Sequence, residues 1–156
     1  MPDIVTAINN DIVNFLKINN FSIKSSPGDS HCFLYSIKTG LRYQLGINLE
    51  LSAIKSHLQA EITQHVCRYE HFLTSGRNHL HDMSNYINHK KYNTSVCDLL
   101  PQILSNSLGI NIRIIDQHIN SNSYNDILIY SLRPAVSTVT LHKKSDHYNA
   151  IIPTPV

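Results

Sequence analysis

Cys32 is the residue of this sequence whose surroundings best suit covalent chemistry. It follows a polar loop, residues 25–31, that contains Pro27 and Gly28, and it opens a run of apolar residues at helical spacing. The first N–H groups of a helix have no partner within the helix and carry partial positive charge, which stabilises a thiolate. With the N–H groups of the loop, they could also bind a developing oxyanion. The position predicts a nucleophile; the alternative is a buried structural cysteine at a helix start.

A nucleophilic cysteine needs a base, and the base needs a group that orients it. The triplet H-Y-N, residues 147–149, follows a short polar loop and opens an apolar strand pattern. Residues two apart in a strand face the same side, so Asn149 can reach the imidazole of His147 and fix its tautomer. A lone histidine at a strand start is usually a surface residue, and His147 gains weight from this neighbour. We predict that Cys32, His147 and Asn149 act together.

The composition fits one domain with a core. The chain has 156 residues, of which 42% are hydrophobic and 15% charged, with five glycines and six prolines. These values exclude collagen-like and disordered chains. The net charge of +2 gives no electrostatic case for binding nucleic acid or an anionic membrane. No apolar stretch approaches the roughly 18 residues of a membrane span, and we expect no secretory signal.

The chain has three cysteines, which is a small and odd number, so a disulfide scaffold is not expected. This count favours a reducing compartment, so we expect a cytoplasmic location, including the cytosol of a host cell. We treat residues 1–156 as one domain and expect a monomer. The last residues, P-T-P-V, end abruptly, and we expect the domain to have been part of a longer protein.

The apolar spacing predicts helices in the first two thirds of the chain. They are expected over residues 4–19, 32–46, 51–73, 77–90 and 98–108. Gly76 is the expected stop after the third helix. Pro101 fixes the start of the last one, because Asp98 as the N-cap places it within the first turn, where its missing N–H costs nothing.

After Gly109 the pattern changes to that of strands, which are expected over residues 110–115, 127–132, 136–141 and 148–152. The connection between the last two, residues 142–146, is short, so these strands should pair as an antiparallel hairpin. Helices followed by strands indicate an α+β domain, with the sheet packed against the helices.

Two of these segments resemble the OTU (ovarian tumour) family of cysteine proteases. The block D-S-H-C-F-L-Y, residues 29–35, is similar to the family's D-G-N-C-L-F-R, and residues 147–149 are similar to its H-Y-N or H-Y-D block. The order and spacing match compact members. Tyr92, residues 96–108 and the strand I-N-I at 110–112 resemble the intervening stretch more weakly.

The resemblance implies a papain-like OTU fold, with a central, mostly antiparallel sheet packed between helices. It implies a thiol-dependent deubiquitinase that cleaves peptide or isopeptide bonds after the C-terminal glycine of ubiquitin or a ubiquitin-like modifier. Cys32 would be the nucleophile, His147 the general base and Asn149 the orienting residue. The backbone amides of Asp29 and Cys32 would line the oxyanion hole. No metal and no organic cofactor is implied, and the modifier with its conjugates would be the partner.

The sequence departs from the family's pattern at two places. The Gly-Asn that normally precedes the cysteine is Ser30-His31 here, which changes the backbone of the oxyanion loop. The usual Trp of the middle block is Tyr92. Both changes leave the three catalytic residue types in place but bear on the choice of chain linkage.

Three other interpretations remain open. The G-D-S at residues 28–30 is similar to the block of GDSL-type serine esterases, with Ser30 as nucleophile, although Lys144 stands where their Asp would precede the histidine. A non-catalytic metal-binding module could use nitrogen and sulfur ligands. Its candidates are Cys67, His71, His79 and His81. An inactive OTU fold that only binds a modifier is the third, and the complete catalytic set argues against it.

Overall fold

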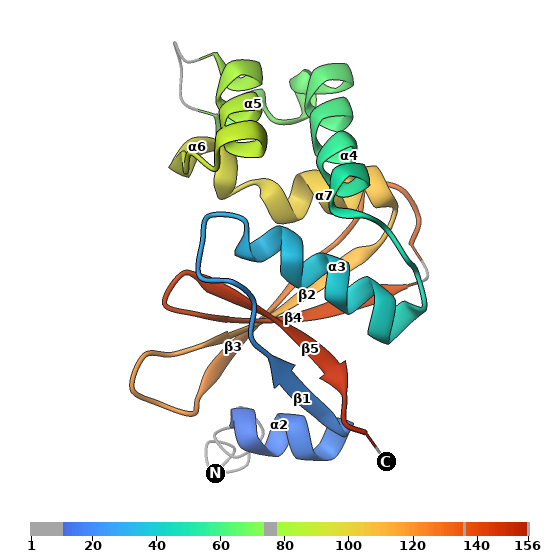
Figure 1. Cartoon of the computed structure of the whole chain (residues 1–156), viewed down its shortest axis with the longest axis vertical. Helices are drawn as coiled ribbons and strands as arrows, with labels where there is room; N and C mark the ends of the chain where they lie inside the picture. Colours follow the sequence, from blue (N-terminus) through green and yellow to red (C-terminus); the bar gives the residue numbers. More distant parts are fainter. Residues whose placement is uncertain (1–10, 74–77, 136, 156) are drawn as a thin grey trace.

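The computed structural model describes residues 11–73, 78–135 and 137–155 of the chain (Figure 1). The helices are α2 (Ile12–Asn19), α3 (Cys32–Leu45), α4 (Leu51–Gln64), α5 (His79–His89), α6 (Thr94–Cys97) and α7 (Leu100–Leu108), with 3-10 turns η1 (Val66–Arg68) and η2 (Glu70–Phe72). The strands are β1 (Phe21–Lys24), β2 (Asn111–Gln117), β3 (Tyr124–Ile129), β4 (Thr138–Lys144) and β5 (His147–Pro153). The predicted α+β class is confirmed.

The strands form one mixed sheet in the order β1-β5-β4-β2-β3. Neighbouring strands are antiparallel except β2 and β4, which run parallel. The predicted hairpin of β4 and β5 is present. Its connection is a two-residue turn, Ser145 and Asp146, which both have positive φ angles of 52° and 62°, as two-residue hairpin turns require.

Helices cover both faces of the sheet, as predicted (Figure 1). Because side chains alternate along a strand, Ile114 and Leu141 join the larger core formed with α3, α4, α5 and α7. Ile115 and Ile151 point to the other face, where they pack with Phe15 of α2 in a second, smaller core. His147 and Asn149, which have the parity of Ile151, belong to this second face.

Helix α3 is fastened to the sheet by two of its residues. The amide of Gln44 donates to the carbonyl oxygens of Thr140 and Ile151 at 2.7 and 2.6 Å and accepts from the Thr140 N–H at 2.8 Å. One turn earlier, Gly40 lets the helix approach so closely that a Cβ there would lie 2.8 Å from Cγ2 of Val139. These contacts set the position of α3, and with it that of its first residue, Cys32.

The third helix is shorter than predicted. The sequence pattern predicted residues 51–73, but α4 ends at Gln64, where His65 has a φ of −131°. The chain turns back through η1 and η2, and the Tyr69 hydroxyl donates to Glu61 Oε2 at 2.7 Å. In a straight helix these two residues would be about 12 Å apart along the axis. The hydrogen bond between them can therefore form only because the helix ends at Gln64 and the chain turns back. Gly76, the expected stop, lies outside the described residues.

Other boundaries differ by a few residues. Strand β1 was not predicted, and β3 runs over residues 124–129 instead of 127–132. Helix α7 begins at Leu100 with Leu99 rather than Asp98 as its N-cap, although Pro101 does lie in the first turn. A short helix, α6, precedes it. Among the described residues, no helix is long and apolar enough to cross a membrane.

Candidate active site

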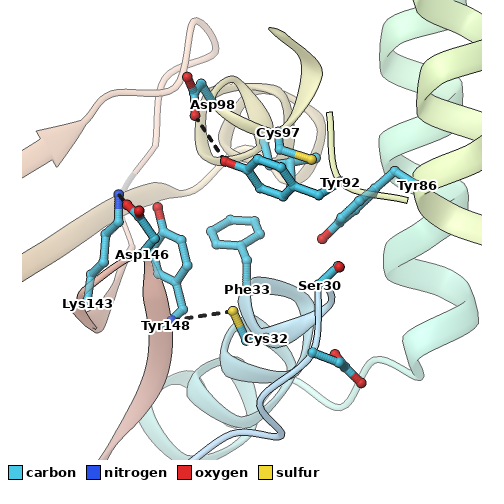
Figure 2. A pocket seen from close by; sticks show the side chains of 12 residues that line it. Ser30, Cys32, Phe33, Tyr86, Tyr92, Cys97, Asp98, Lys143, Asp146 and Tyr148 are labelled. Atoms are coloured by element: carbon cyan, nitrogen blue, oxygen red, sulfur yellow. Dashed lines mark hydrogen bonds and ion pairs between the residues drawn. The ribbon is translucent and has the colours of Figure 1, made fainter. Parts of the chain in front are cut away.

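Cys32 lies at the free edge of β5. Strand β1 is only four residues long and pairs with residues 150–153 of β5, so the start of β5 has no strand on its outer side. The chain leaves β1 at Lys24, passes along this edge and enters α3 at Cys32. There the Tyr148 N–H, which points away from β4, donates to Cys32 Sγ at 3.4 Å (Figure 2). The nucleophile predicted from sequence is thus in contact with the predicted H-Y-N segment.

The Cys32 side chain borders a cavity of about 280 Å³. Figure 2 shows Tyr148 and Lys143 on one wall, Ser30 and Tyr86 on another, and Tyr92 across from the thiol. The Tyr92 hydroxyl is 3.5 Å from Asp98 Oδ1. The floor is apolar, because the Tyr148 ring packs edge-on against Phe33 with their centroids 5.1 Å apart. A peptide strand could enter this cavity and present a carbonyl to Cys32.

Asn149 is held by two hydrogen bonds from its side chain, and neither involves His147. Its Oδ1 accepts the Ser26 N–H at 3.2 Å, and its Nδ2 is 3.1 Å from His142 Nδ1. The first bond ties β5 to the loop that leads into Cys32. His147, half-buried at the start of β5, faces the same side of the strand, but among the described residues it makes no hydrogen bond with Cys32 or Asn149. Catalytic hydrogen bonds are often long in proteins without substrate and tighten when the substrate binds.

His142 was missed by the sequence analysis. It lies opposite Asn149 in the β4–β5 register and is 3% exposed. Its Nε2 is 2.9 Å from Oε1 of Gln117. Because that oxygen only accepts, Nε2 carries the proton, and Nδ1 is left to accept from the Asn149 amide. Burial lowers the pKa of His142, with a contribution from Lys144, which keeps the ring in this neutral form.

Hydrogen bonds and an ion pair hold the loop before Cys32 against the C-terminal end of α5. Lys90 Nζ binds Asp29 Oδ2 at 3.0 Å, and the His31 N–H donates to Asp29 Oδ1 at 2.8 Å. Burial alone would raise the pKa of Asp29, but these hydrogen bonds outweigh it and hold the pKa below its usual value. The Cys32 N–H donates to the Asp29 carbonyl at 3.1 Å. Of the two amides predicted to bind an oxyanion, that of Asp29 has no partner among the described residues, and that of Cys32 is already engaged.

At the position where the OTU block that this sequence resembles has Asn, His31 forms a buried anchor. Its side chain is 0% exposed, and its Nε2 is 2.6 Å from the carbonyl oxygen of Tyr86. A carbonyl accepts only, so Nε2 is the donor. Burial lowers the pKa of His31, and its Nδ1 has no partner among the described residues. The departure from the family pattern therefore fixes the loop to α5.

The other two cysteines are less suited to nucleophilic attack. Burial raises the pKa of Cys97 to about 11, so its thiol stays protonated at neutral pH. Cys67 is exposed, but it lies in η1, away from the N-terminus of any long helix. All three cysteines are free.

The metal interpretation loses its geometric basis. Cys67 and His71 were expected one turn apart on one helix, but they lie in separate 3-10 turns. Among the described residues, no group of three or more His, Cys, Asp or Glu side chains could hold a metal ion. The esterase interpretation requires a buried strand before Ser30, and β1, which precedes it, is an edge strand of the sheet.

The fold is that of OTU deubiquitinases. No protein-family model and no curated protein matches the sequence. Among solved structures, an OTU deubiquitinase from Wolbachia pipientis bound to ubiquitin has a TM-score of 0.62 at 16% identity, covering 86% of this chain and 97% of that one. The OTU domain of OTUD1 has a TM-score of 0.66 at 13% identity, covering 94% and 97%. The viral OTU protease of Taggert virus has a TM-score of 0.62 at 18% identity, covering 87% and 81%.

Proposed function

We propose that this protein is a cysteine protease that hydrolyses peptide or isopeptide bonds after the C-terminal glycine of ubiquitin or a ubiquitin-like modifier. One observation carries the proposal. The Cys32 thiol, at the N-terminus of α3, contacts the main chain of β5 between His147 and Asn149 and faces an open cavity. The OTU fold and the ubiquitin-bound neighbours, among them the OTU of Hazara virus, support the choice of substrate.

In the acylation half of the reaction, His147 removes the proton from Cys32 and Sγ attacks the carbonyl carbon of the last glycine. The carbonyl electrons move to oxygen, where the Asp29 N–H binds them, joined by the Cys32 N–H as it turns from the Asp29 carbonyl. Collapse of the tetrahedral intermediate breaks the C–N bond. The leaving amine takes the proton from His147, and a thioester remains on Cys32.

In the second half, water attacks the thioester carbon and gives a proton to His147. Collapse breaks the S–C bond, releases the modifier with a free carboxylate and returns the proton to the thiol. Asn149 acts as a positioning residue: anchored to Ser26 and His142, it holds the strand start that carries His147 beside the loop that carries Cys32. The thiol must stay reduced for this cycle, which fits the proposed reducing compartment.

A panel of linked ubiquitin dimers, resolved by gel electrophoresis, tests the proposal. Wild-type protein should release monomeric ubiquitin from at least one linkage, and Cys32→Ala should release none while keeping a cooperative melt. Cys67→Ala is the matched control, because it removes the exposed thiol and should retain full activity. Ser30→Ala should also retain most activity. An inactive Ser30→Ala with an active Cys32→Ala would instead favour the serine esterase.

An inactive protein that only binds a modifier is separated by the same panel. Such a protein would bind ubiquitin, with cleavage of none of the dimers and no difference between wild type and Cys32→Ala. That result would overturn the proposed hydrolase.

A further inference from the structure

Tyr86 carries a buried hydroxyl group that has no hydrogen-bond partner in the part of the chain that the structure describes. The residue lies on α5 and is 0% exposed. Leaving a hydroxyl buried and unpaired costs free energy, and folded proteins rarely do so. The hydroxyl belongs to a side chain that lines the cavity beside Cys32, and in Figure 2 it points toward the space between Ser30 and Tyr92.

The ring of Tyr86 cannot turn to another partner. It packs against the His31 ring in a T-shaped contact, with centroids 4.8 Å apart. Its own carbonyl oxygen accepts from His31 Nε2 at 2.6 Å. Both contacts tie Tyr86 to the residue next to Cys32, so the direction of the hydroxyl is fixed relative to the nucleophile.

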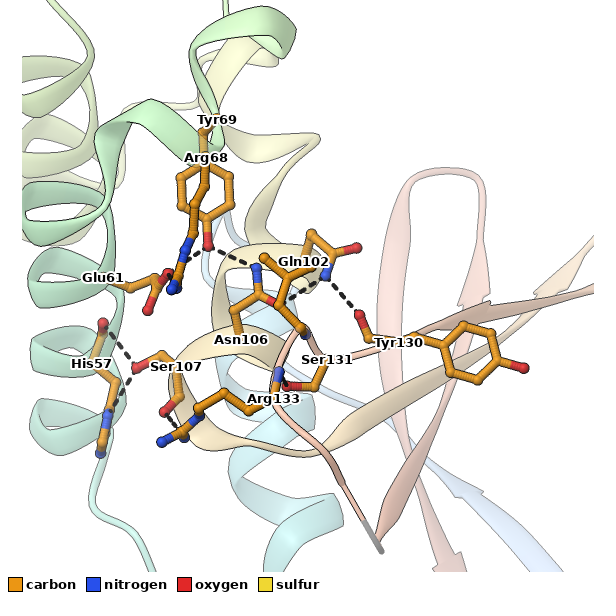
Figure 3. A network of polar contacts seen from close by, with 11 residues as sticks. His57, Glu61, Arg68, Tyr69, Gln102, Asn106, Ser107, Tyr130, Ser131 and Arg133 are labelled. Atoms are coloured by element: carbon orange, nitrogen blue, oxygen red, sulfur yellow. Dashed lines mark hydrogen bonds and ion pairs between the residues drawn. The ribbon is translucent and has the colours of Figure 1, made fainter.

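Tyr69 shows what a satisfied buried tyrosine looks like in this fold. It is 2% exposed, its hydroxyl donates to Glu61 at 2.7 Å and accepts from Asn106 at 2.9 Å (Figure 3). The chain therefore does pair a buried phenol where the phenol serves the fold. The unpaired one faces the cavity.

The Tyr86 hydroxyl is a donor under physiological conditions. Burial raises its pKa, with smaller contributions from Cys97 and Cys32, so the phenol stays protonated. The glycine at the end of the modifier tail has no side chain, so it offers only main-chain N–H and carbonyl groups to the cavity. Of these, a carbonyl oxygen is the acceptor that a protonated phenol requires.

We propose that the Tyr86 hydroxyl donates a hydrogen bond to a main-chain carbonyl oxygen of the modifier tail bound in the cavity beside Cys32. This inference rests on the proposed function and adds a substrate-binding residue to it. The bond forms in the bound substrate and persists in the transition state, so it strengthens binding of both equally. Its loss should raise KM and leave kcat nearly unchanged.

The test is Tyr86→Phe, assayed with ubiquitin that carries a fluorogenic amide at its C-terminus. A neutral hydrogen bond contributes about 0.5–1.5 kcal/mol, so KM should rise about 2- to 13-fold. The melting temperature should stay equal to that of wild type or rise, because no partner in the protein is lost. Tyr69→Phe is the matched control: it should lower the melting temperature and leave KM unchanged.

Three results would overturn the inference. An unchanged KM for Tyr86→Phe in an active enzyme removes the substrate contact and leaves the proposed function standing. A melting temperature that falls as far as in Tyr69→Phe shows that the hydroxyl serves the fold. Wild-type protein that cleaves no modifier conjugate overturns the proposed function and this inference together.

Discussion

Replacing Asn149 by alanine should destabilise the fold as well as slow the enzyme, because its amide links three segments. The Ser26 N–H loses its acceptor at 3.2 Å, and His142 Nδ1 loses its donor at 3.1 Å. The first bond contributes about 0.5–1.5 kcal/mol, and an unpaired acceptor on the buried His142 ring costs about 1–3 kcal/mol. We expect Asn149→Ala to lower the free energy of unfolding by about 3 kcal/mol, or the melting temperature by about 6–12 °C.

Urea denaturation of four proteins isolates the coupling: wild type, Asn149→Ala, His142→Leu and the double variant. Leucine at position 142 has no acceptor to leave unpaired, so adding Asn149→Ala to His142→Leu should cost about 1 kcal/mol or less. Two results would refute the reasoning. One is an Asn149→Ala variant within 0.5 kcal/mol of wild type, and the other is two substitutions whose effects simply add.

Acid should destabilise the protein as the pH falls below about 6.5, the ordinary pKa of histidine, because burial lowers the pKa of both His31 and His142 in the folded protein. The unfolded chain then binds protons that the native state does not. The free energy of unfolding present above pH 6.5 is therefore lost at up to about 1.4 kcal/mol per pH unit for each histidine. A urea midpoint that does not change as the pH falls below about 6.5 would contradict this prediction. Gly40→Ala should lower stability by about 1 kcal/mol despite alanine's helix preference, because Val139 is buried. In a Val139→Ala background calorimetry should show a smaller loss, and a stabilised Gly40→Ala would show that α3 has room. Gln44→Leu removes three hydrogen bonds to β4 and β5 and should lower the free energy of unfolding, measured by urea denaturation, by about 3 kcal/mol. An unchanged free energy of unfolding would show that Gln44 does not hold α3 to the sheet.

Local signals in the sequence were enough to place α3 and to put Cys32 at its first position. A polar loop with Pro and Gly, an apolar helical pattern and Gly46 as the left-handed cap define both ends of this helix. The hairpin that brings the H-Y-N segment, residues 147–149, back to Cys32 was equally predictable. Its turn was placed too broadly, over residues 142–146, because Ser145 and Asp146 are not the usual Asn-Gly or Asp-Gly pair for positive φ.

Because the predicted connection included residue 142, the sequence analysis did not place His142 in a strand. A two-residue turn at 145–146 places residue 142 opposite residue 149, so the exact register would have paired His142 with Asn149. The end of α4 was unpredictable for another reason, since the apolar stripe continues to Leu73. Only tertiary contacts, the Tyr69 and Arg68 side chains meeting Glu61, decide that the chain turns at His65.

Tyr86 had no signal in the sequence at all. Its spacing on α5 is that of a core residue, and it is buried like one. Only the three-dimensional arrangement shows that its hydroxyl is unpaired and belongs to the wall of the cavity beside Cys32.

The central claim, that Cys32 is the nucleophile of a deubiquitinase, is tested most directly by a ubiquitin whose C-terminal carboxylate is replaced by a thiol-reactive alkyne or vinyl group. Mass spectrometry should locate the adduct on Cys32, because its thiol borders the cavity and contacts the main chain of β5 beside His147. His147→Ala should slow the capture strongly and Asn149→Ala less. Exposure alone favours Cys67, and burial keeps Cys97 protonated. An adduct on Cys67, or none with any ubiquitin-like probe, would contradict the account.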